Sequence, residues 1–102
     1  MVLLEFSMSP LDKGESLSPY VARILNIIDS SGTTYKLTPM GSILEGEYED
    51  VMNVVKDCFQ ELQKDCNRIS VSIKIDYRAG TKSRLSSKIE RIESILGKSL
   101  PK

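Results

Sequence analysis

The stretch YKLTPMGSILEGE, residues 35–47, decides how the rest of the chain is arranged. It predicts two short strands joined by a Pro39-Met40-Gly41 turn, because proline and glycine are residues that tight turns favour. The second strand leads directly into a long amphipathic helix. Turn chemistry does not explain Glu45, which places a carboxylate in an otherwise apolar strand.

Two longer strands flank this unit in the sequence. Residues 2–9 and 68–78 alternate apolar and polar side chains with a period of two, which indicates strands with one buried face. The polar side of the second of these strands carries Ser70, Ser72, Lys74, Asp76 and Arg78.

Apolar residues at helical spacing predict three helices, over about 18–30, 48–66 and 82–96. We expect the first to begin with Ser18 as its N-cap and Pro19 at the first helical position. The apolar stripe of the third helix is Leu85, Ile89, Ile92 and Leu96.

The resulting order is β-α-β-β-α-β followed by a helix, which is the α+β ferredoxin-like pattern. Right-handed crossovers place both main helices on one face of a four-stranded antiparallel sheet, with the C-terminal helix beyond it. We expect the helices to cover Phe6, Ile73 and their neighbours. A length of 102 residues fits one domain, residues 1–102.

The face of the sheet away from the helices is expected to be polar. The first and third strands are central in this fold, so Glu5 and Glu45 should be near neighbours, with Lys74 and Asp76 one strand away. One interpretation is a solvated face with cross-strand charge pairs. The other is a face partly covered by a second subunit, with a polar pocket suited to a small cationic or amine-bearing ligand.

The sequence does not decide which side of the second strand joins this face. The two alternatives are Tyr35 with Leu37, or Lys36 with Thr38.

Composition excludes several classes of partner and chemistry. The 14 basic and 14 acidic residues give a formal net charge of zero, which argues against nucleic acid as the main partner. Without histidine, the chain can build neither a Ser-His or Cys-His nucleophile nor a His-ligated zinc site. We predict no metal site and no secretory signal or membrane span. Cys58 and Cys66 match no metal spacing and are expected to be buried and free, which favours the reducing cytosol.

Charge is nonetheless uneven along the chain. Residues 43–66 contain seven acids and two bases, whereas residues 68–102 contain nine bases and three acids. Such blocks usually form solvated helix faces, and the alternative is that opposite patches meet in an oligomer.

Other activities of this topology are not supported. RNA-binding domains stack bases on exposed aromatics of the sheet, whereas Phe6 and Tyr77 are expected on the helix side. The loop after the first strand contains Lys13 and no arginine for an acylphosphatase-like phosphate loop. Two cysteines are too few for an iron–sulfur cluster.

Short runs along nearly the whole length resemble the small thiamine-binding protein family, also called the YkoF-like proteins. The matching runs are Ser7-Met8-Ser9-Pro10, Gly14-Glu15-Ser16, Tyr35-x-Leu37-Thr38-Pro39-Met40-Gly41-Ser42, Leu44-Glu45-Gly46-Glu47, Arg68-Ile69-Ser70-Val71 and Lys74-Ile75-Asp76-Tyr77-Arg78. Their order and spacing together carry the resemblance. One departure is Ser42, where the family usually has threonine.

This resemblance implies a ferredoxin-like protein that forms dimers or dimers of dimers. It implies a non-catalytic, cytoplasmic role in binding thiamine or its hydroxymethylpyrimidine part, with thiamine as ligand and no other cofactor. The alternative is a structural module whose sheet face serves only homo-oligomerisation. The ligand-binding residues expected on this basis are Ser7, Tyr35, Thr38, Met40, Gly41, Ser42, Glu45, Lys74 and Asp76, and either pocket or interface remains open for Lys74, Asp76 and Arg78.

Overall fold

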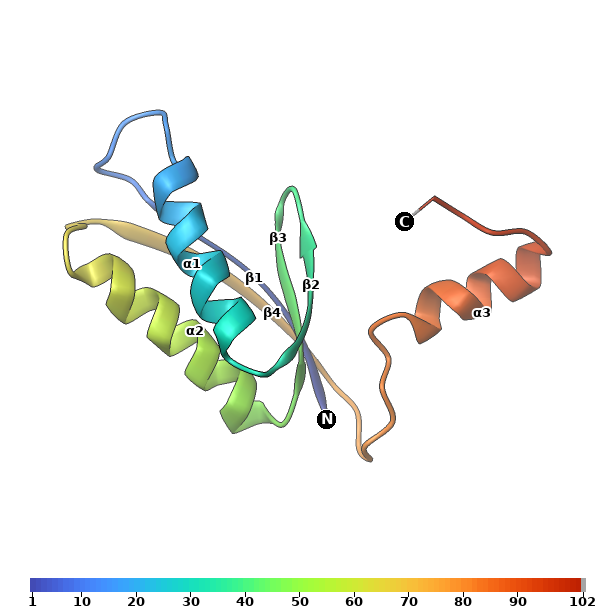
Figure 1. The fold of residues 1–102 in the computed structure, drawn as a ribbon. Helices are drawn as coiled ribbons and strands as arrows, with labels where there is room; N and C mark the ends of the chain where they lie inside the picture. The colour runs from blue at the N-terminus through green and yellow to red at the C-terminus, as the bar shows by residue number, and fades with distance from the viewer. Residues whose placement is uncertain (102) are drawn as a thin grey trace.

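The computed structural model describes residues 1–101 and contains four strands and three helices within them (Figure 1). Their order confirms the predicted β-α-β-β-α-β arrangement followed by a helix. The elements are β1 (Val2–Pro10), α1 (Ser18–Ser30), β2 (Thr34–Thr38), β3 (Gly41–Gly46), α2 (Tyr48–Gln63), β4 (Ile69–Tyr77) and α3 (Ser87–Leu96).

The four strands form one antiparallel sheet in the order β2-β3-β1-β4, so β1 and β3 are central, as the sequence predicts. Helices α1 and α2 lie side by side on one face of this sheet (Figure 1). Helix α3 projects away from the rest of the molecule (Figure 1). The fold is therefore the ferredoxin-like α+β sandwich with an added C-terminal helix.

The core lies between the sheet and the two packed helices. Alternate residues of β1, from Val2 to Met8, turn toward the helices and are buried. Cys58 is buried on α2 and Cys66 just beyond it, and both are free thiols, as predicted. The largest fully buried side chains are Leu4, Ile28, Leu44, Leu62, Val51 and Cys58.

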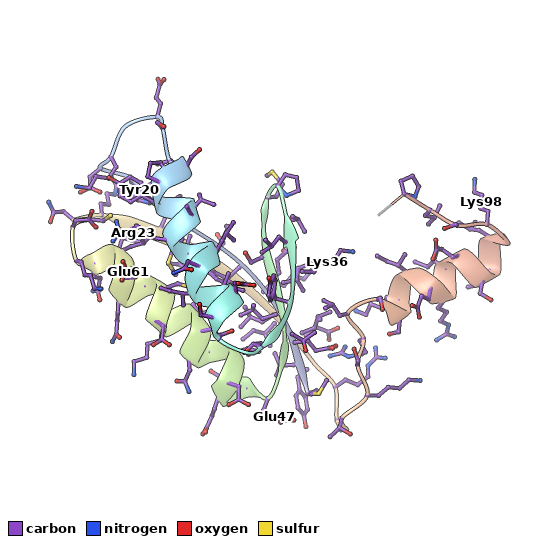
Figure 2. All side chains as sticks on the ribbon, viewed as in Figure 1. Tyr20, Arg23, Lys36, Glu47, Glu61 and Lys98 are labelled. Carbon is purple, nitrogen blue, oxygen red and sulfur yellow. The ribbon has the colours of Figure 1, made fainter. Side chains whose placement is uncertain are left out.

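Arg23 of α1 clamps the two packed helices together at their outer surface (Figure 2). Its guanidinium donates to Glu61 Oε1 at 3.2 Å and to both carboxylate oxygens of Asp65 at 3.1 and 3.0 Å. These hydrogen bonds hold the pKa of Asp65 below its usual range. The Tyr20 ring lies 5.6 Å from the same guanidinium, which adds a cation–π contact.

Three predicted helix boundaries are wrong. Helix α1 already includes Ser18, and Leu17 occupies the N-cap position because its carbonyl accepts from the Val21 N–H at 3.0 Å. Helix α2 ends at Gln63 rather than near Cys66. Helix α3 begins at Ser87 rather than near Lys82, since the preceding residues are held against the sheet.

The expectation that the helices cover Ile73 is also wrong. Ile73 and Tyr77 pair with Phe6 and Val2, which places them on the helix side, yet they are 43% and 69% exposed. The buried core side chains of the sheet come from the central strands β1 and β3, so the helices pack over the middle of the sheet and leave half of the edge strand β4 uncovered. The uncovered half of β4 is an apolar strip at the edge of the sheet.

Candidate ligand-binding site

Charged and apolar residues form two rows across the open face of the sheet, the face away from α1 and α2. In one row, Leu3 of β1 stands between Glu45 and Asp76. In the next row, Glu5 stands between Ile43 and Lys74. Glu5 and Glu45 are therefore diagonal neighbours on adjacent strands, as the sequence predicts.

The register of β2 resolves the alternative that the sequence leaves open. Lys36 pairs with Ile43, so Lys36 and Thr38 join the open face. Figure 2 shows Lys36 pointing away from the two packed helices. Tyr35 lies on the helix side instead, where its hydroxyl donates to Asp29 Oδ1 at 2.6 Å and this hydrogen bond raises the Tyr35 pKa. The structure therefore separates Tyr35 from Glu45.

The hydroxyl of Thr38 forms its hydrogen bonds within the turn between β2 and β3. Thr38 Oγ1 donates to the Gly41 carbonyl at 2.9 Å and accepts from the Met40 N–H at 3.2 Å. These bonds close the turn, as threonine hydroxyls often do. Met40 at its tip is 87% exposed and packs little against the rest of the chain.

The predicted site residues therefore fall into two groups. Ser42 pairs with Phe6 and is buried toward the helices, on the opposite face from Glu45. It lines an apolar hollow of about 170 Å³ between α1 and the β2–β3 turn. Ser7 lies on the open face and, with Met40, lines a hollow of about 160 Å³ that also includes Glu5 and Lys74.

Glu45 is bound by a segment that sequence reasoning assigned to a helix. Its carboxylate accepts from Ser83 Oγ at 2.5 Å and from the Arg84 N–H at 2.5 Å, and the residue is 6% exposed. These hydrogen bonds explain why a carboxylate is tolerated inside an apolar strand. Residues 81–86 consequently cross the end of the open face, and we call this stretch the crossing segment.

The side chain of Arg84 extends the same network to the edge strand. Arg84 is buried, and its guanidinium donates to Asp76 Oδ2 at 2.8 Å and to the Asp76 carbonyl at 2.9 Å. Lys88 of α3 donates to the same Oδ2 at 2.9 Å. Hydrogen bonds from Lys88 and then Arg84 hold the Asp76 pKa below its usual range, so Asp76 is ionised at neutral pH. No sequence pattern indicates Ser83, Arg84 or Lys88 as site residues.

A hollow of about 470 Å³ lies on the open face between the two rows and the start of α3. This volume is in the range of small-molecule sites. Leu3 and Ile43 give it an apolar floor, and Glu5 and Asp76 supply carboxylates at its sides. Its lining residues are Leu3, Glu5, Ile43, Lys74, Ile75, Asp76 and Lys88, and we call it the sheet-face hollow.

A larger hollow of about 650 Å³ lies beyond the end of the sheet, beside α2. Glu45, Asp50 and Asp57 line it, together with hydroxyl residues of the α1–β2 loop. It lacks the strand-borne apolar floor of the sheet-face hollow, so it offers less to a flat ring. Among residues 1–101, no three metal-ligating side chains gather into a cluster, and no helix has the length and apolarity to cross a membrane.

The family model described as "Thiamine-binding protein" matches residues 4–93 of the chain. The chain belongs to the thiamine-binding protein family. Curated relatives in this family include UPF0045 protein MJ1052 of Methanocaldococcus jannaschii, which is 29% identical over 89% of this chain and 91% of its own length. UPF0045 protein YqgV of Bacillus subtilis is 31% identical over 94% of this chain and 98% of its own.

Solved structures of thiamine-binding-family relatives share the fold. The crystal structure of MJ1052 superimposes with a TM-score of 0.81 at 28% identity, covering 89% of this chain and 94% of that one. A protein of Thermotoga maritima, described as a candidate for thiamine biosynthesis or salvage, gives a TM-score of 0.77 at 26% identity, covering 89% and 97%. The resemblance that the sequence motifs indicated is therefore confirmed.

Proposed function

We propose that this chain is a non-catalytic protein that binds thiamine or its hydroxymethylpyrimidine part in the sheet-face hollow. The observation that carries the proposal is the combination of an apolar floor, Leu3 and Ile43, with carboxylates at Glu5 and Asp76. Membership of a family described as thiamine-binding supports the choice of ligand. The absence of histidine from the sequence supports binding rather than acid–base catalysis.

The chemistry of the ligand matches this surface. An aminopyrimidine ring is flat and largely apolar, so it can lie on Leu3 and Ile43. Its exocyclic amine can donate to Glu5. The thiazolium ring of thiamine can lie beside Asp76, whose Oδ2 already accepts from Arg84 and Lys88. Glu45 does not line this hollow, but it holds the crossing segment beside it in place. The hollow that Ser7 and Met40 line shares Glu5 and Lys74 with this one, so a bound ligand can extend toward the turn.

Calorimetry with thiamine and with hydroxymethylpyrimidine tests the proposal. We expect Glu5→Gln to weaken binding at least tenfold, or about 1.4 kcal/mol, without changing stability. Glu45→Gln should weaken binding and also lower stability, because glutamine presents an amide donor to the donors of Ser83 and Arg84. Asp57→Asn, at the larger hollow, is the control and should leave affinity unchanged. No heat and no thermal shift at millimolar ligand would exclude both ligands.

A second candidate function, self-association, is favoured by a different set of exposed residues. We propose that the uncovered edge of β4 pairs with a second copy of the chain, since a long free edge strand presents unpaired backbone groups. Ile73 and Tyr77 on this edge are exposed, and so are Ile92, Ile95 and Leu96 on α3. Dimers or dimers of dimers would bury both patches. We also propose a cytoplasmic location, which the two free cysteines support.

A further inference from the structure

Basic side chains surround a further hollow, of about 260 Å³, on the far side of Asp76 from Glu45. They come from the end of β4, from the crossing segment and its approach, and from the first two turns of α3. The lining residues are Arg78, Ala79, Lys82, Arg84, Ser87, Lys88 and Arg91, and we call this the basic hollow. Five of these seven residues are cationic, and none is acidic.

The positive charge of the basic hollow is largely uncompensated. Asp76 neutralises part of it through Arg84 and Lys88. Within residues 1–101, Arg78, Lys82 and Arg91 form no ion pair. Like charges held around one small space repel one another, and a bound anion relieves that repulsion. The basic hollow is therefore suited to an anion.

The chemistry of the donors points to a phosphate group. Guanidinium forks of Arg78 and Arg91 can each donate two parallel hydrogen bonds to phosphate oxygens, and Lys82 adds a mobile ammonium. Ser87 contributes a hydroxyl from the first turn of α3. Extended nucleic acid is a poor occupant, because the chain has no net positive charge and this surface is confined to one hollow.

The basic hollow adjoins the sheet-face hollow. Lys88 lines both of them, and the Asp76 carboxylate that it contacts faces the sheet-face side. A molecule with an aminopyrimidine or thiazolium ring at one end and a phosphate at the other would place the ring beside the apolar floor and Glu5, and the phosphate among the cations of the basic hollow. We propose that the preferred ligands of this protein are phosphorylated, and that Arg78, Lys82 and Arg91 bind the phosphate. The ring end of this inference rests on the proposed function, whereas the phosphate end does not.

Titration calorimetry with four probes tests the inference: thiamine, thiamine monophosphate, inorganic phosphate and pyrophosphate. We expect the wild-type chain to bind thiamine monophosphate at least about tenfold more tightly than thiamine, because the phosphate adds a set of charge-assisted hydrogen bonds. The double variant Lys82→Gln/Arg91→Gln should bind both forms equally, with its affinity for thiamine unchanged. Lys56→Gln/Arg68→Gln removes the same charge elsewhere and should retain the wild-type preference.

The outcomes separate this inference from the proposed function. If thiamine binds and its monophosphate binds no better, the phosphate site is wrong and the proposed function stands. If thiamine does not bind, but pyrophosphate binds and depends on Lys82 and Arg91, the phosphate site stands and the ring assignment is wrong. Sedimentation of the double variant gives a further check: loss of an oligomer with intact phosphate affinity would assign these cations to an interface and overturn the inference.

Discussion

At the scale of single residues, Gly41 is the position in the β2–β3 turn that leaves no room for a side chain. A Cβ atom placed there would lie 2.7 Å from the Phe6 carbonyl oxygen, closer than such atoms approach in folded proteins. That oxygen belongs to the backbone of the central strand β1, so it cannot move aside without disturbing the pairing of β1 with β3.

Gly41→Ala is therefore expected to destabilise the fold by roughly 2 kcal/mol, in the range of steric overpacking. Gly46→Ala is the matched control, at the other end of the same strand, where a Cβ would meet Val51 at an ordinary 3.5 Å. It should be neutral, or stabilising by about 0.5 kcal/mol, because alanine restricts the unfolded chain. Urea unfolding followed by circular dichroism measures both, and equal stabilities would contradict the steric argument.

The sequence identified Glu45 as unusual but not its partners. A lone carboxylate in an apolar strand is a local signal, whereas Ser83 and Arg84 lie 38 and 39 residues away with no pattern linking them. Grouping Ser42 with Glu45 around one pocket overlooked a simpler rule. Residues three positions apart in a strand point to opposite faces.

At the scale of elements, the crossing segment shows where helical periodicity misleads. Leu85 fits the apolar stripe of α3, so the sequence predicts a helix from about Lys82. Ser83 and Arg84 instead form hydrogen bonds to β3 and β4, and the helix begins after them, at Ser87. Tertiary contacts override helix propensity here.

Asp76 should make the attachment of the crossing segment sensitive to acid. The pKa of Asp76 is lower in the folded protein than in the unfolded chain, where it is about 3.9. Its ion pairs therefore contribute their full stability at pH values above the unfolded pKa. This stability is lost as the pH falls through the folded pKa. We expect amide protection of residues 81–88 to persist from neutral pH to about pH 4 and to fall below it. Hydrogen exchange measures this protection.

Asp76→Asn should show reduced protection of the same amides already at neutral pH. Asp57→Asn, which removes the same charge from α2, should behave as wild type. Full protection of residues 81–88 in Asp76→Asn at pH 7 would show that Glu45 alone holds the segment.

At the scale of the whole molecule, topology could be predicted because strand and helix periodicities are distinct and their order admits one common arrangement. The extent of helix cover could not, since it depends on where the helices lie across the width of the sheet. Their position over the central strands leaves Ile73 exposed on the edge strand. The apolar stripe of α3 is likewise uncovered, because none of its residues is buried. The proposed self-association follows from these two surfaces.

We expect the wild-type chain to sediment as a dimer or a dimer of dimers at micromolar concentration. Ile73→Lys should shift it toward monomer by placing a charge on the free edge, as should Ile95→Lys on α3, where the side chain is 77% exposed. Leu11→Lys changes another exposed apolar residue, in the β1–α1 loop, and should leave the oligomer intact. A wild-type monomer at all concentrations would contradict self-association.

The two buried thiols have a practical consequence. Burial raises the pKa of Cys58 to about 12, and its Sγ lies 3.8 Å from the Ile24 carbonyl across the α1–α2 interface. Thiolates, not thiols, react with alkylating agents, so Cys58 in the native fold should be inert at neutral pH. Its alkylation requires α2 to separate from α1, and the rate of labelling at Cys58 therefore reports the free energy of opening of the core in an unmodified sample.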